Sequence, residues 1–578
     1  MSDEKKDVRI ATFDIEAENF VRPFLVGFYD GQDFFYFEGE NCVKRFCEFI
    51  LGRKNKYSKY RIYAHAGGSY DFLFLIEQFS EMGLKMNILI QNSSVFYFSV
   101  ERGKKYLKFY DSYHLLPLNL EELTKAFNVE YKKINLDRSK IYEIYRKDRP
   151  LVIKYLKHDC IGLYQVLKKF YEIIYELGGE VRRTLSSTSF NLFKRKLEDQ
   201  NIKIATVDNE RWRSYYYGGR VEVFLRHGYD LYYYDFNSLY PYVMAKYSYP
   251  IDVPVKEDPN KFEDYEAGFV TVKVKVSIPE DHYPAPLPVR MDQKLIFPVG
   301  EFITTIPLPE FKYSLDTGFI EDFYIYELYV FNDVEPIFKD FIKELYERRL
   351  EAKKTGNKAL DLIFKLLMNS CYGKFGEKNV KERLKKISED EHDLLYQYPL
   401  YLEKAGIVKI SENVKLRHVH LGIASHITCY ARIELLDLML RILKKGGLIY
   451  YCDTDSVVTN IRLPTGDRLG ELKLEYEIFE GVFYGPKLYA LKLKSGEEVV
   501  KAKGFPKALV SFNDIKKAVF EGYKFSTTFE KFGRLKESIR RFNQFYSMIQ
   551  IEKRLLSDYD KRIIIDKIYT KPIKLEIS

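Results

Sequence analysis

The sequence has few of the residues from which zinc sites and disulfide frameworks are built. Its 6 cysteines are scattered over 578 residues, and no two of them form a C-x-x-C pair. This spacing argues against structural zinc and is typical of a reducing compartment. The chain also lacks a run of the roughly eighteen apolar residues that a membrane span requires, and its charged first residues lead into a strand-like run without a signal peptide. We therefore expect an intracellular protein that is not secreted and has no membrane partner.

Tryptophan is nearly absent, with 1 residue, whereas tyrosine and phenylalanine number 49 and 43. Aromatic side chains among basic ones can stack on nucleic-acid bases, although a tyrosine-rich core and surface explains most of them. The net charge of +9 permits a polyanionic partner without requiring one. A hydrophobic content of 46% is ordinary for a globular protein, and the length is too great for a single core.

The pattern of strand-like and helix-like runs changes along the chain. Short β-branched runs alternate with amphipathic helices as far as the glycine pair at 178–179, which predicts an α/β domain over residues 1–180. Farther on, strand-like segments are separated by long charged helices, which predicts an α+β domain with a helical subdomain over residues 181–578. The fold class is therefore a multidomain combination of α/β and α+β, without internal repeats.

The run LIYYCDTDSVVTN, from Leu448 to Asn460, places Asp453 and Asp455 one residue apart. If the run is one continuous strand, both carboxylates project from the same face and repel each other unless a cation neutralises them. If it is a turn at the end of a strand, no cation is needed, because turns use aspartate freely. This stretch alone does not decide between the two interpretations.

A first group of acids lies before residue 180. Asp14 and Glu16 share one face of the strand-like run TFDIEA, and Asp71 begins a helix after a glycine turn. Asp159 follows Tyr155 by four residues, so both side chains reach the same point on a helix. Four acids and a phenol in this order are a set suited to two-metal hydrolysis of phosphodiesters.

A second group lies after residue 230. The segment YYYDFNSLYPYVM places Asp235 at the end of an aromatic strand, before a turn and a helix that carry Ser238 and Tyr240. Oxygen ligands without a Cys or His cluster favour Mg²⁺ or Mn²⁺ over zinc. A metal site built from Asp235 and the 453–455 pair is therefore the functional hypothesis.

The segment FKLLMNSCYGKFGE predicts a helix with Lys365, Asn369 and Tyr372 along one stripe. A partly exposed amphipathic face would explain this stripe without any function. The functional interpretation is a helix that offers a cation to triphosphate oxygens and an aromatic ring to a base.

The first group of acids resembles the three motifs of DEDD-type 3′-5′ proofreading exonucleases, with Tyr155 and Asp159 in the Tyr-x3-Asp form. The resemblance implies an RNase H-like domain in which Asp14, Glu16, Asp71 and Asp159 bind metal. The family usually has HNGGxYD where this chain has HAGGSYD, so Ala66 replaces an asparagine that orients the primer strand. Weaker strand positioning with retained metal binding is therefore expected.

Two shorter segments are similar to DNA-binding motifs of the same exonucleases. YDSYHLL is similar to the S/T-L-x2-h motif with Tyr113 in place of leucine, and KINL fits the K-x2-h motif. The resemblance thus implies DNA contacts from Ser112 and Lys133.

The second group, together with YCDTDSV, resembles motifs A (D-x-x-S-L-Y-P), B (K-x3-N-S-x-Y-G) and C (Y-x-D-T-D-S) of family B DNA polymerases. The resemblance implies a right-hand polymerase with an antiparallel palm sheet, helical fingers and a small thumb. Asp235 and Asp455 would hold two Mg²⁺ or Mn²⁺ ions, with Asp453 beside them as a supporting acid. Each of the two active sites is expected to take two ions.

The resemblance also assigns contacts to nucleotide and DNA. Tyr240 would exclude a 2′-hydroxyl and Lys365 would hold the phosphates, and the whole expected nucleotide-binding set is Ser238, Leu239, Tyr240, Lys353, Lys365, Asn369 and Tyr372, with Lys354 as an alternative to Lys353. PKLYALK matches the K-x-Y motif that contacts primer and template, and YYGGRV matches the Y-x-G-G motif between the two modules. The expected DNA-binding set is Tyr216, Gly218, Gly219, Lys487, Tyr489, Ser112 and Lys133.

The compact length is similar to the protein-primed branch of this family, found in linear-genome phages, viruses and plasmids. That branch carries two insertions, for which residues 285–346 would dock a terminal protein and residues 377–418 would encircle DNA. The remaining expected parts are the palm (181–284, 347–352 and 419–504), the fingers (353–376) and the thumb (505–578). Expected partners of this monomer are template and primer DNA, dNTPs, a terminal protein and a single-stranded DNA-binding protein.

Two other functions stay open at this point. One is a family B DNA polymerase that extends ordinary nucleic-acid primers. The other, from a different class, is a non-catalytic DNA-binding replication scaffold, although a scaffold has no need of paired acids. A nuclease alone would leave the three polymerase motifs unexplained.

Overall fold

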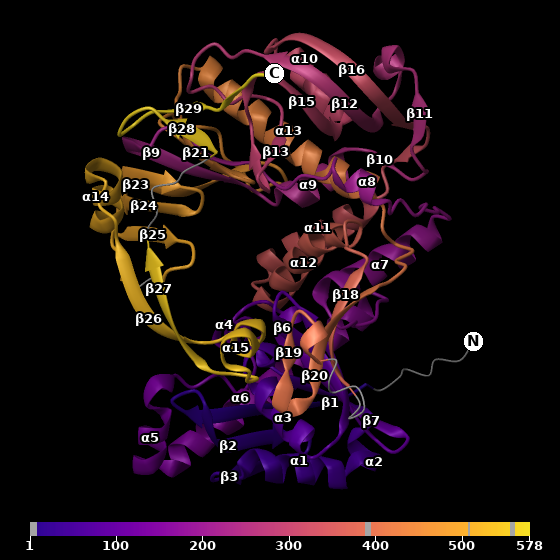
Figure 1. Ribbon diagram of the computed structural model, residues 1–578, viewed down its shortest axis with the longest axis vertical. Coiled ribbons are helices and arrows are strands. Elements are labelled where there is room, and N and C mark those ends of the chain that lie inside the picture. Colours follow the sequence, from indigo (N-terminus) through magenta and orange to yellow (C-terminus); the bar gives the residue numbers. More distant parts are fainter. Residues whose placement is uncertain (1–7, 388–394, 507–508, 555–560, 578) are drawn as a thin grey trace.

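The computed structural model describes residues 8–387, 395–506, 509–554 and 561–577 (Figure 1). The predicted fold class, an α/β domain followed by an α+β domain, is confirmed. No helix in these ranges is both long enough and apolar enough to cross a bilayer.

A 10-stranded sheet organises the N-terminal part of the chain. Its strand β1 (Arg9–Glu18) pairs in parallel with β4 (Tyr60–Ala64) and antiparallel with β2 (Arg22–Tyr29). Phe13 and Ile15 on one face of β1 join the apolar core formed with helices α1 (Cys42–Gly52) and α3 (Asp71–Glu81). Alternation along the strand then leaves its acids on the opposite face.

The opposite face of β1 is covered by the long helix α6 (Arg149–Glu176). Thr12 Oγ1 donates a hydrogen bond of 2.7 Å to the carbonyl of Cys160 on that helix. Because Thr12, Asp14 and Glu16 share a face, this contact directs the two acids toward α6 and its Asp159.

The expected processivity insertion contributes to the same sheet. Strands β18 (Val380–Lys386), β20 (Ile407–Asn413) and β19 (Tyr401–Leu402) continue it through pairing of β18 with β5 (Lys85–Gln91). Thus Glu382 lies opposite Ile90 across an antiparallel ladder. Backbone hydrogen bonds therefore join residues of the 377–418 segment directly to the N-terminal domain.

A 7-stranded antiparallel sheet forms the palm region, in the order β25-β24-β23-β9-β22-β21-β8. Helix α13 (Leu421–Lys444) is buried along most of its length and packs on this sheet together with α9 (Leu239–Lys246). The strands are β8 (Val221–Val223), β9 (His227–Phe236), β21 (Ile449–Asp453), β22 (Ser456–Thr459), β23 (Leu472–Gly485), β24 (Leu488–Leu493) and β25 (Glu498–Ala502).

Two antiparallel helices, α11 (Lys339–Lys354) and α12 (Lys358–Ser370), form the fingers region. They pack on α7 (Leu185–Asp199), where the ring of Phe193 lies 4.7 Å from that of Phe338. One continuous apolar core contains these helices, α6 and α13. The exonuclease-like and polymerase-like parts therefore share buried side chains in this core, in addition to the core that β1 forms with α1 and α3.

The segment expected to dock a terminal protein supplies two strands of a 5-stranded sheet in the order β11-β16-β12-β15-β30. Helix α10 (Leu308–Asp316) covers one face of it. The final strand of the chain, β30, pairs in parallel with β15. The strands are β11 (Val255–Glu257), β16 (Ile320–Phe331), β12 (Ala267–Val276), β15 (Val299–Pro307) and β30 (Lys574–Leu575).

The expected thumb contains α14 (Phe512–Glu521), a long hairpin of β26 (Ser526–Phe532) and β27 (Met548–Arg554), and α15 (Leu535–Phe542). The hairpin reaches the N-terminal domain, as Figure 1 shows. There the phenol of Tyr546 donates a hydrogen bond of 2.8 Å to Glu77 on helix α3. The precise limits of the palm, fingers and thumb stay predictions.

Candidate active sites

The polymerase-like acids lie where β21 turns into β22. Asp453 ends β21 and pairs with Ser456, so Thr454 and Asp455 form a two-residue turn. Thr454 has φ of 60°, in the left-handed region that such turns require. The interpretation of 453–455 as a continuous strand was therefore wrong, and the turn interpretation is confirmed.

The turn nevertheless brings two acids together, because β22 also pairs with β9. Ser456 lies opposite Asp235, and the amide of Phe236 donates a hydrogen bond of 2.8 Å to the carbonyl of Asp455. Burial raises the pKa of Asp235 to about 7, with the nearby carboxyl of Asp455 as the next cause. Two acids that are far apart in the sequence thus share one partly buried point on the palm sheet.

Burial and then the charge of Asp453 raise the pKa of Asp455 as well, whereas Lys365 acts in the opposite direction on Asp235 and Asp455. Neither of these two carboxylates forms a salt bridge within the described part of the chain. Three lysines oppose the repulsion without pairing with either acid: Lys365 acts on both, Lys473 on Asp235 and Lys487 on Asp455. Two raised acids without a salt bridge fit a site that binds divalent cations.

Asp453 is different, because a lysine already neutralises it. The ammonium of Lys487 lies 2.9 and 2.7 Å from its two carboxylate oxygens, and the phenol of Tyr451 donates to it at 3.2 Å. The supporting role that the sequence suggested is consistent with this geometry.

Among the residues expected to bind nucleotide, the rings of Tyr240 and Tyr372 stack in parallel at 4.8 Å. Burial raises the pKa of Tyr240 to about 12. Tyr372 does not belong to α12 as expected, because that helix ends at Ser370 and a 3₁₀ turn begins at Tyr372. Asn369 is still in the helix, and its side-chain amide donates to the carbonyl of Lys365 at 2.7 Å.

Ser238 precedes helix α9 in the left-handed region, with φ of 57°. Leu239 is 1% exposed and packs in the core, so only its backbone can face a ligand. Lys353 and Lys354 lie in the last turn of α11, and neither forms a salt bridge to another described residue. The second phosphate contact expected from one of them stays a prediction.

Arg349, one turn earlier in α11, was missed by the sequence interpretation. Its guanidinium lies 2.7 Å from Asp361 on α12 and 3.5 Å from the hydroxyl of Ser238. It thus links the two fingers helices to Ser238 at the start of α9. The available signal was its spacing of four residues from Lys353, which places both on one helix face.

The two glycines of YYGGRV have different surroundings. A Cβ on Gly219 would lie 2.7 Å from the side chain of Thr454, so glycine allows the segment before β8 to approach the acidic turn closely. A Cβ on Gly218 would meet nothing within 4 Å, and its carbonyl accepts a hydrogen bond of 2.9 Å from Arg432. The ring of Tyr216 lies against Gly376, near the end of the segment FKLLMNSCYGKFGE that carries motif B.

The K-x-Y residues lie beside the acidic turn. Lys487 has φ of 58°, and its backbone amide donates to the phenol of Tyr451 at 3.0 Å. Tyr489 is 5% exposed, with its ring 5.2 Å from that of Tyr451. Tyr489 therefore supports the turn from within the sheet, while the ammonium of Lys487 stays accessible.

The exonuclease-like acids form a tighter group. Asp14, Glu16 and Asp159 each place a carboxylate oxygen within 4.8 Å of the other two. One buried oxygen of each has no hydrogen-bond partner within the described residues. Converging, unsatisfied carboxylate oxygens are the donor set that Mg²⁺ or Mn²⁺ requires.

Electrostatics agree with that assignment. Burial and the charge of Asp14 raise the pKa of Glu16 and of Asp71. Burial raises the pKa of Asp159 to about 6. Asp71 begins α3 as expected, and one of its oxygens accepts a hydrogen bond of 3.0 Å from the amide of Ile15. All four acids therefore lie around β1.

Two cations accompany these acids. Lys133 forms an ion pair with Asp159, and its ammonium lies 3.2 Å from the hydroxyl of Tyr155. Burial lowers the pKa of Arg138, but the charges of Glu16 and Asp14 outweigh this effect and raise it. The sequence interpretation included Lys133 and missed Arg138, which no motif marked.

Ser112 is fully buried, so its expected contact with DNA has no direct support. Its hydroxyl donates to the carbonyl of Ala64 at 3.0 Å and lies 3.0 Å from His65 Nδ1. These bonds position the loop that carries Ala66.

Ala66 has φ of 57°, a conformation that costs a residue with a Cβ about 1–2 kcal/mol. Ala66→Gly should therefore raise the free energy of unfolding by about 1 kcal/mol without changing exonuclease activity. Ala66→Asn should also stabilise, since asparagine tolerates this region, and should in addition increase degradation of single-stranded DNA. Thermal melting and a labelled-oligonucleotide assay separate the two effects, and equal nuclease rates for all three proteins would contradict the strand-positioning role.

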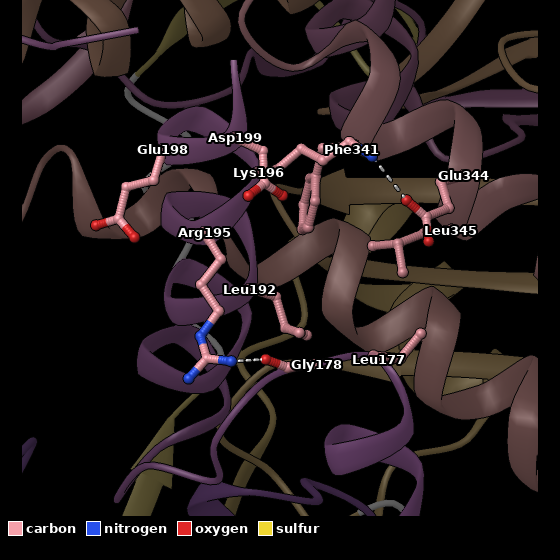
Figure 2. A pocket seen from close by; sticks show the side chains of 10 residues that line it. All are labelled: Leu177, Gly178, Leu192, Arg195, Lys196, Glu198, Asp199, Phe341, Glu344 and Leu345. Carbon is pink, nitrogen blue, oxygen red and sulfur yellow. Dashed lines mark hydrogen bonds and ion pairs between the residues drawn. The ribbon is translucent and has the colours of Figure 1, made fainter. Parts of the chain in front are cut away.

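A cavity of about 600 Å³ lies between α6, α7 and α11 (Figure 2). Leu192 and Phe341 contribute to its apolar wall, and none of the expected site residues lines it. Both basic residues of its lining are engaged, because Arg195 donates to the carbonyl of Gly178 and Lys196 pairs with Glu344. The cavity therefore belongs to neither group of acids.

The sequence pattern of the family described as DNA polymerase type B, organellar and viral, matches residues 52–150 and 142–415, more than half of the chain. The chain belongs to this family of DNA polymerases. Among relatives of this type B polymerase, the DNA-directed DNA polymerase of Enterobacteria phage PRD1 is 28% identical, with 86% of each chain covered. The DNA polymerase of Acidianus bottle-shaped virus is 24% identical, with 87% of this chain and 76% of the relative covered.

Fungal relatives of the type B polymerase are longer. The chain is 28% identical to relatives from Podospora anserina and Neurospora intermedia but spans only 41% and 56% of their lengths.

Among solved structures, Phi29 DNA polymerase complexed with primer-template DNA and incoming nucleotide superposes with a TM-score of 0.75 at 17% identity, covering 95% of this chain and 100% of that one. This similarity confirms the fold of an exonuclease domain followed by a polymerase domain.

Proposed function

We propose that this polymerase synthesises DNA on a template and removes mispaired 3′ ends with its exonuclease domain. Each active site is proposed to take two Mg²⁺ or Mn²⁺ ions. The observation that carries the polymerase assignment is the meeting of Asp235, on β9, with Asp455, in the turn before β22. Burial raises the pKa of each acid, and neither forms a salt bridge within the described residues. Bound divalent ions would favour ionisation of the primer 3′-hydroxyl and neutralise the incoming triphosphate.

The chain's own residues would orient the nucleotide. Lys365 and Arg349 supply positive charge on the fingers side, where the triphosphate would enter. The stacked rings of Tyr240 and Tyr372 form a flat surface for the sugar and the nascent base pair. Asn369, at the end of α12, would complete that surface.

Tyr240→Val should increase incorporation of ribonucleotides relative to deoxynucleotides by about tenfold or more, which corresponds to about 1.4 kcal/mol. The smaller side chain removes the ring that would clash with a 2′-hydroxyl. Tyr242→Val, two residues along the same helix, is the matched control. Single-nucleotide kcat/KM for dATP and ATP measures the effect, and unchanged selectivity would remove Tyr240 from this role.

For the exonuclease, we propose that Asp14, Glu16, Asp71 and Asp159 hold the ions and that Tyr155 orients the attacking water. Lys133 lies within reach of both Tyr155 and Asp159, where it would contact the scissile phosphate. Ions bound there would activate the water and stabilise the leaving oxygen.

We further propose that DNA synthesis starts on a terminal protein and that the enzyme replicates a linear genome inside its host cell. Support comes from the 285–346 segment, which contributes strand β16 to the 5-stranded sheet. On this strand Tyr324 is 63% exposed and Tyr326 is 48% exposed. Exposed aromatic side chains of this kind are typical of protein-docking surfaces. A single-stranded DNA-binding protein is the other proposed partner.

Incubation with labelled dATP, Mg²⁺, genome ends and a candidate terminal protein tests this priming. A covalent nucleotide on Ser, Thr or Tyr of that protein is the expected product. Extension of DNA primers without any adduct would favour the ordinary-primer alternative. Absence of both activities, with DNA binding retained, would favour the scaffold.

A further inference from the structure

Residues 561–577, here called the returning segment, run back from the thumb region to the palm. Strands β28 (Arg562–Ile564) and β29 (Thr570–Pro572) form a hairpin close to β21, as Figure 1 shows. The hydroxyl of Thr570 lies 2.9 Å from the carbonyls of Val223 and Phe224, and the amide of Arg226 donates to Ile568 at 2.7 Å. The hairpin therefore covers the edge strand of the palm sheet.

A buried arginine fixes the start of this segment. Arg562 is 1% exposed and donates to the hydroxyl of Thr570 at 2.9 Å and to the carbonyl of Asp281 at 2.5 Å. Its guanidinium also lies 3.4 Å from Glu222, which pairs on its other side with Arg220. A buried cation that several partners hold has little freedom to move. The backbone of the residue next to Arg562 is therefore fixed too.

That neighbour is Lys561, whose ammonium donates to the carbonyl of Val221 at 3.4 Å. Val221 is the register partner of Asp453 across strands β8 and β21. Lys561 thus lies near Asp453 without pairing with it, whereas Lys487 forms an ion pair with Asp453 from the β23–β24 turn. Two lysines from distant parts of the sequence therefore flank the acidic turn.

The charges around Lys561 are not balanced. Arg220, Arg562 and Lys561 surround the single carboxylate of Glu222, while Asp453 is already neutralised by Lys487. Burial lowers the pKa of Lys561, and the charge of Glu222 opposes this effect. Within the described residues, the ammonium has only the carbonyl of Val221 as a hydrogen-bond partner, so further N–H groups are available to an anion.

We propose that Lys561 contacts a backbone phosphate of the primer strand beside Asp453. The inference rests on the proposed polymerase function, since it takes duplex DNA as the anion. A lysine ammonium provides such a contact as a point charge without reading the sequence. The returning segment would then act as a part of the primer-binding surface and not only as a brace for the sheet.

The test compares the full-length chain with Lys561→Ala, Lys561→Arg and Lys571→Ala. Lys571 is an exposed lysine on the same hairpin and serves as the matched control. Binding of a fluorescent primer-template is titrated in EDTA, which prevents degradation, at several salt concentrations. Thermal melting of each protein and its exonuclease rate on single-stranded DNA are measured alongside.

Lys561→Ala should weaken primer-template binding by about three- to tenfold and lower the slope of log K against log salt by about 0.9, the value for one phosphate contact. Lys561→Arg should restore both, and Lys571→Ala should match the wild type. Equal affinity and slope for Lys561→Ala and the wild type would overturn the proposal, as would a loss that Lys561→Arg fails to restore. A wild-type chain that neither binds nor extends a primer would instead refute the polymerase function itself.

Discussion

Asp455→Asn is expected to reduce nucleotide incorporation by about three orders of magnitude or more, which corresponds to about 4 kcal/mol of lost transition-state stabilisation. The substitution removes one of two carboxylates that share a buried point and have no salt-bridge partner within the described residues. An amide is a weaker metal ligand because it carries no negative charge. Single-turnover extension of a primer-template measures the loss.

Primer-template affinity should change by less than about twofold, because the lysines that flank the acidic turn remain. Exonuclease activity should also persist, since the other acid group is untouched. Asp437→Asn, which alters an acid on helix α13 that pairs with Arg441, is the matched control and should behave like the wild type. Retained synthesis by Asp455→Asn would refute the assignment of the polymerase site.

Glu16→Gln should have the second large effect, with loss of exonuclease activity by about two orders of magnitude or more and retained polymerisation. Glu16→Gln should also stabilise the metal-free protein, whereas most substitutions destabilise a protein. Burial and the neighbouring Asp14 raise the pKa of Glu16, so its charged form destabilises the metal-free protein. The neutral amide should therefore raise the melting temperature in EDTA.

The wild type, in contrast, should gain stability from Mn²⁺, by about 2.7 kcal/mol when the ion is present at one hundred times its dissociation constant. Glu16→Gln should lose the part of this gain that comes from the exonuclease site. Glu18→Gln, at the end of the same strand, is the control and should keep the full gain. Identical Mn²⁺ responses in all three proteins would show that this acid group binds no metal.

Much of both sites could be predicted because the signal is local. Asp14 and Glu16 alternate on one strand and Asp159 follows Tyr155 by one helical turn, so their side chains share faces in any fold that keeps these elements. The convergence of these side chains depends in addition on the packing of α6 against the acidic face of β1, which the local pattern does not predict. The hydrogen bond from Thr12 to Cys160 is what reveals this packing.

Other features depended on contacts that no local pattern encodes. The turn at Thr454 exists because Asp453 pairs with Ser456, and a β-branched residue at positive φ would not be expected there. Arg349 is positioned by Asp361, which lies on the next helix. Lys561 is positioned by the edge strand β8, which is far from it in the sequence. The pairing of β18 with β5 likewise joins segments almost three hundred residues apart.

The central claim is that acids at positions 235 and 455 hold a pair of divalent ions for nucleotide transfer. Anomalous diffraction from a crystal with Mn²⁺, a primer-template and a non-hydrolysable dNTP tests it most directly. The account predicts two manganese peaks about 4 Å apart, both bound by Asp235 and Asp455 and facing the triphosphate. Manganese bound elsewhere, or a triphosphate seated away from these two carboxylates, would contradict it.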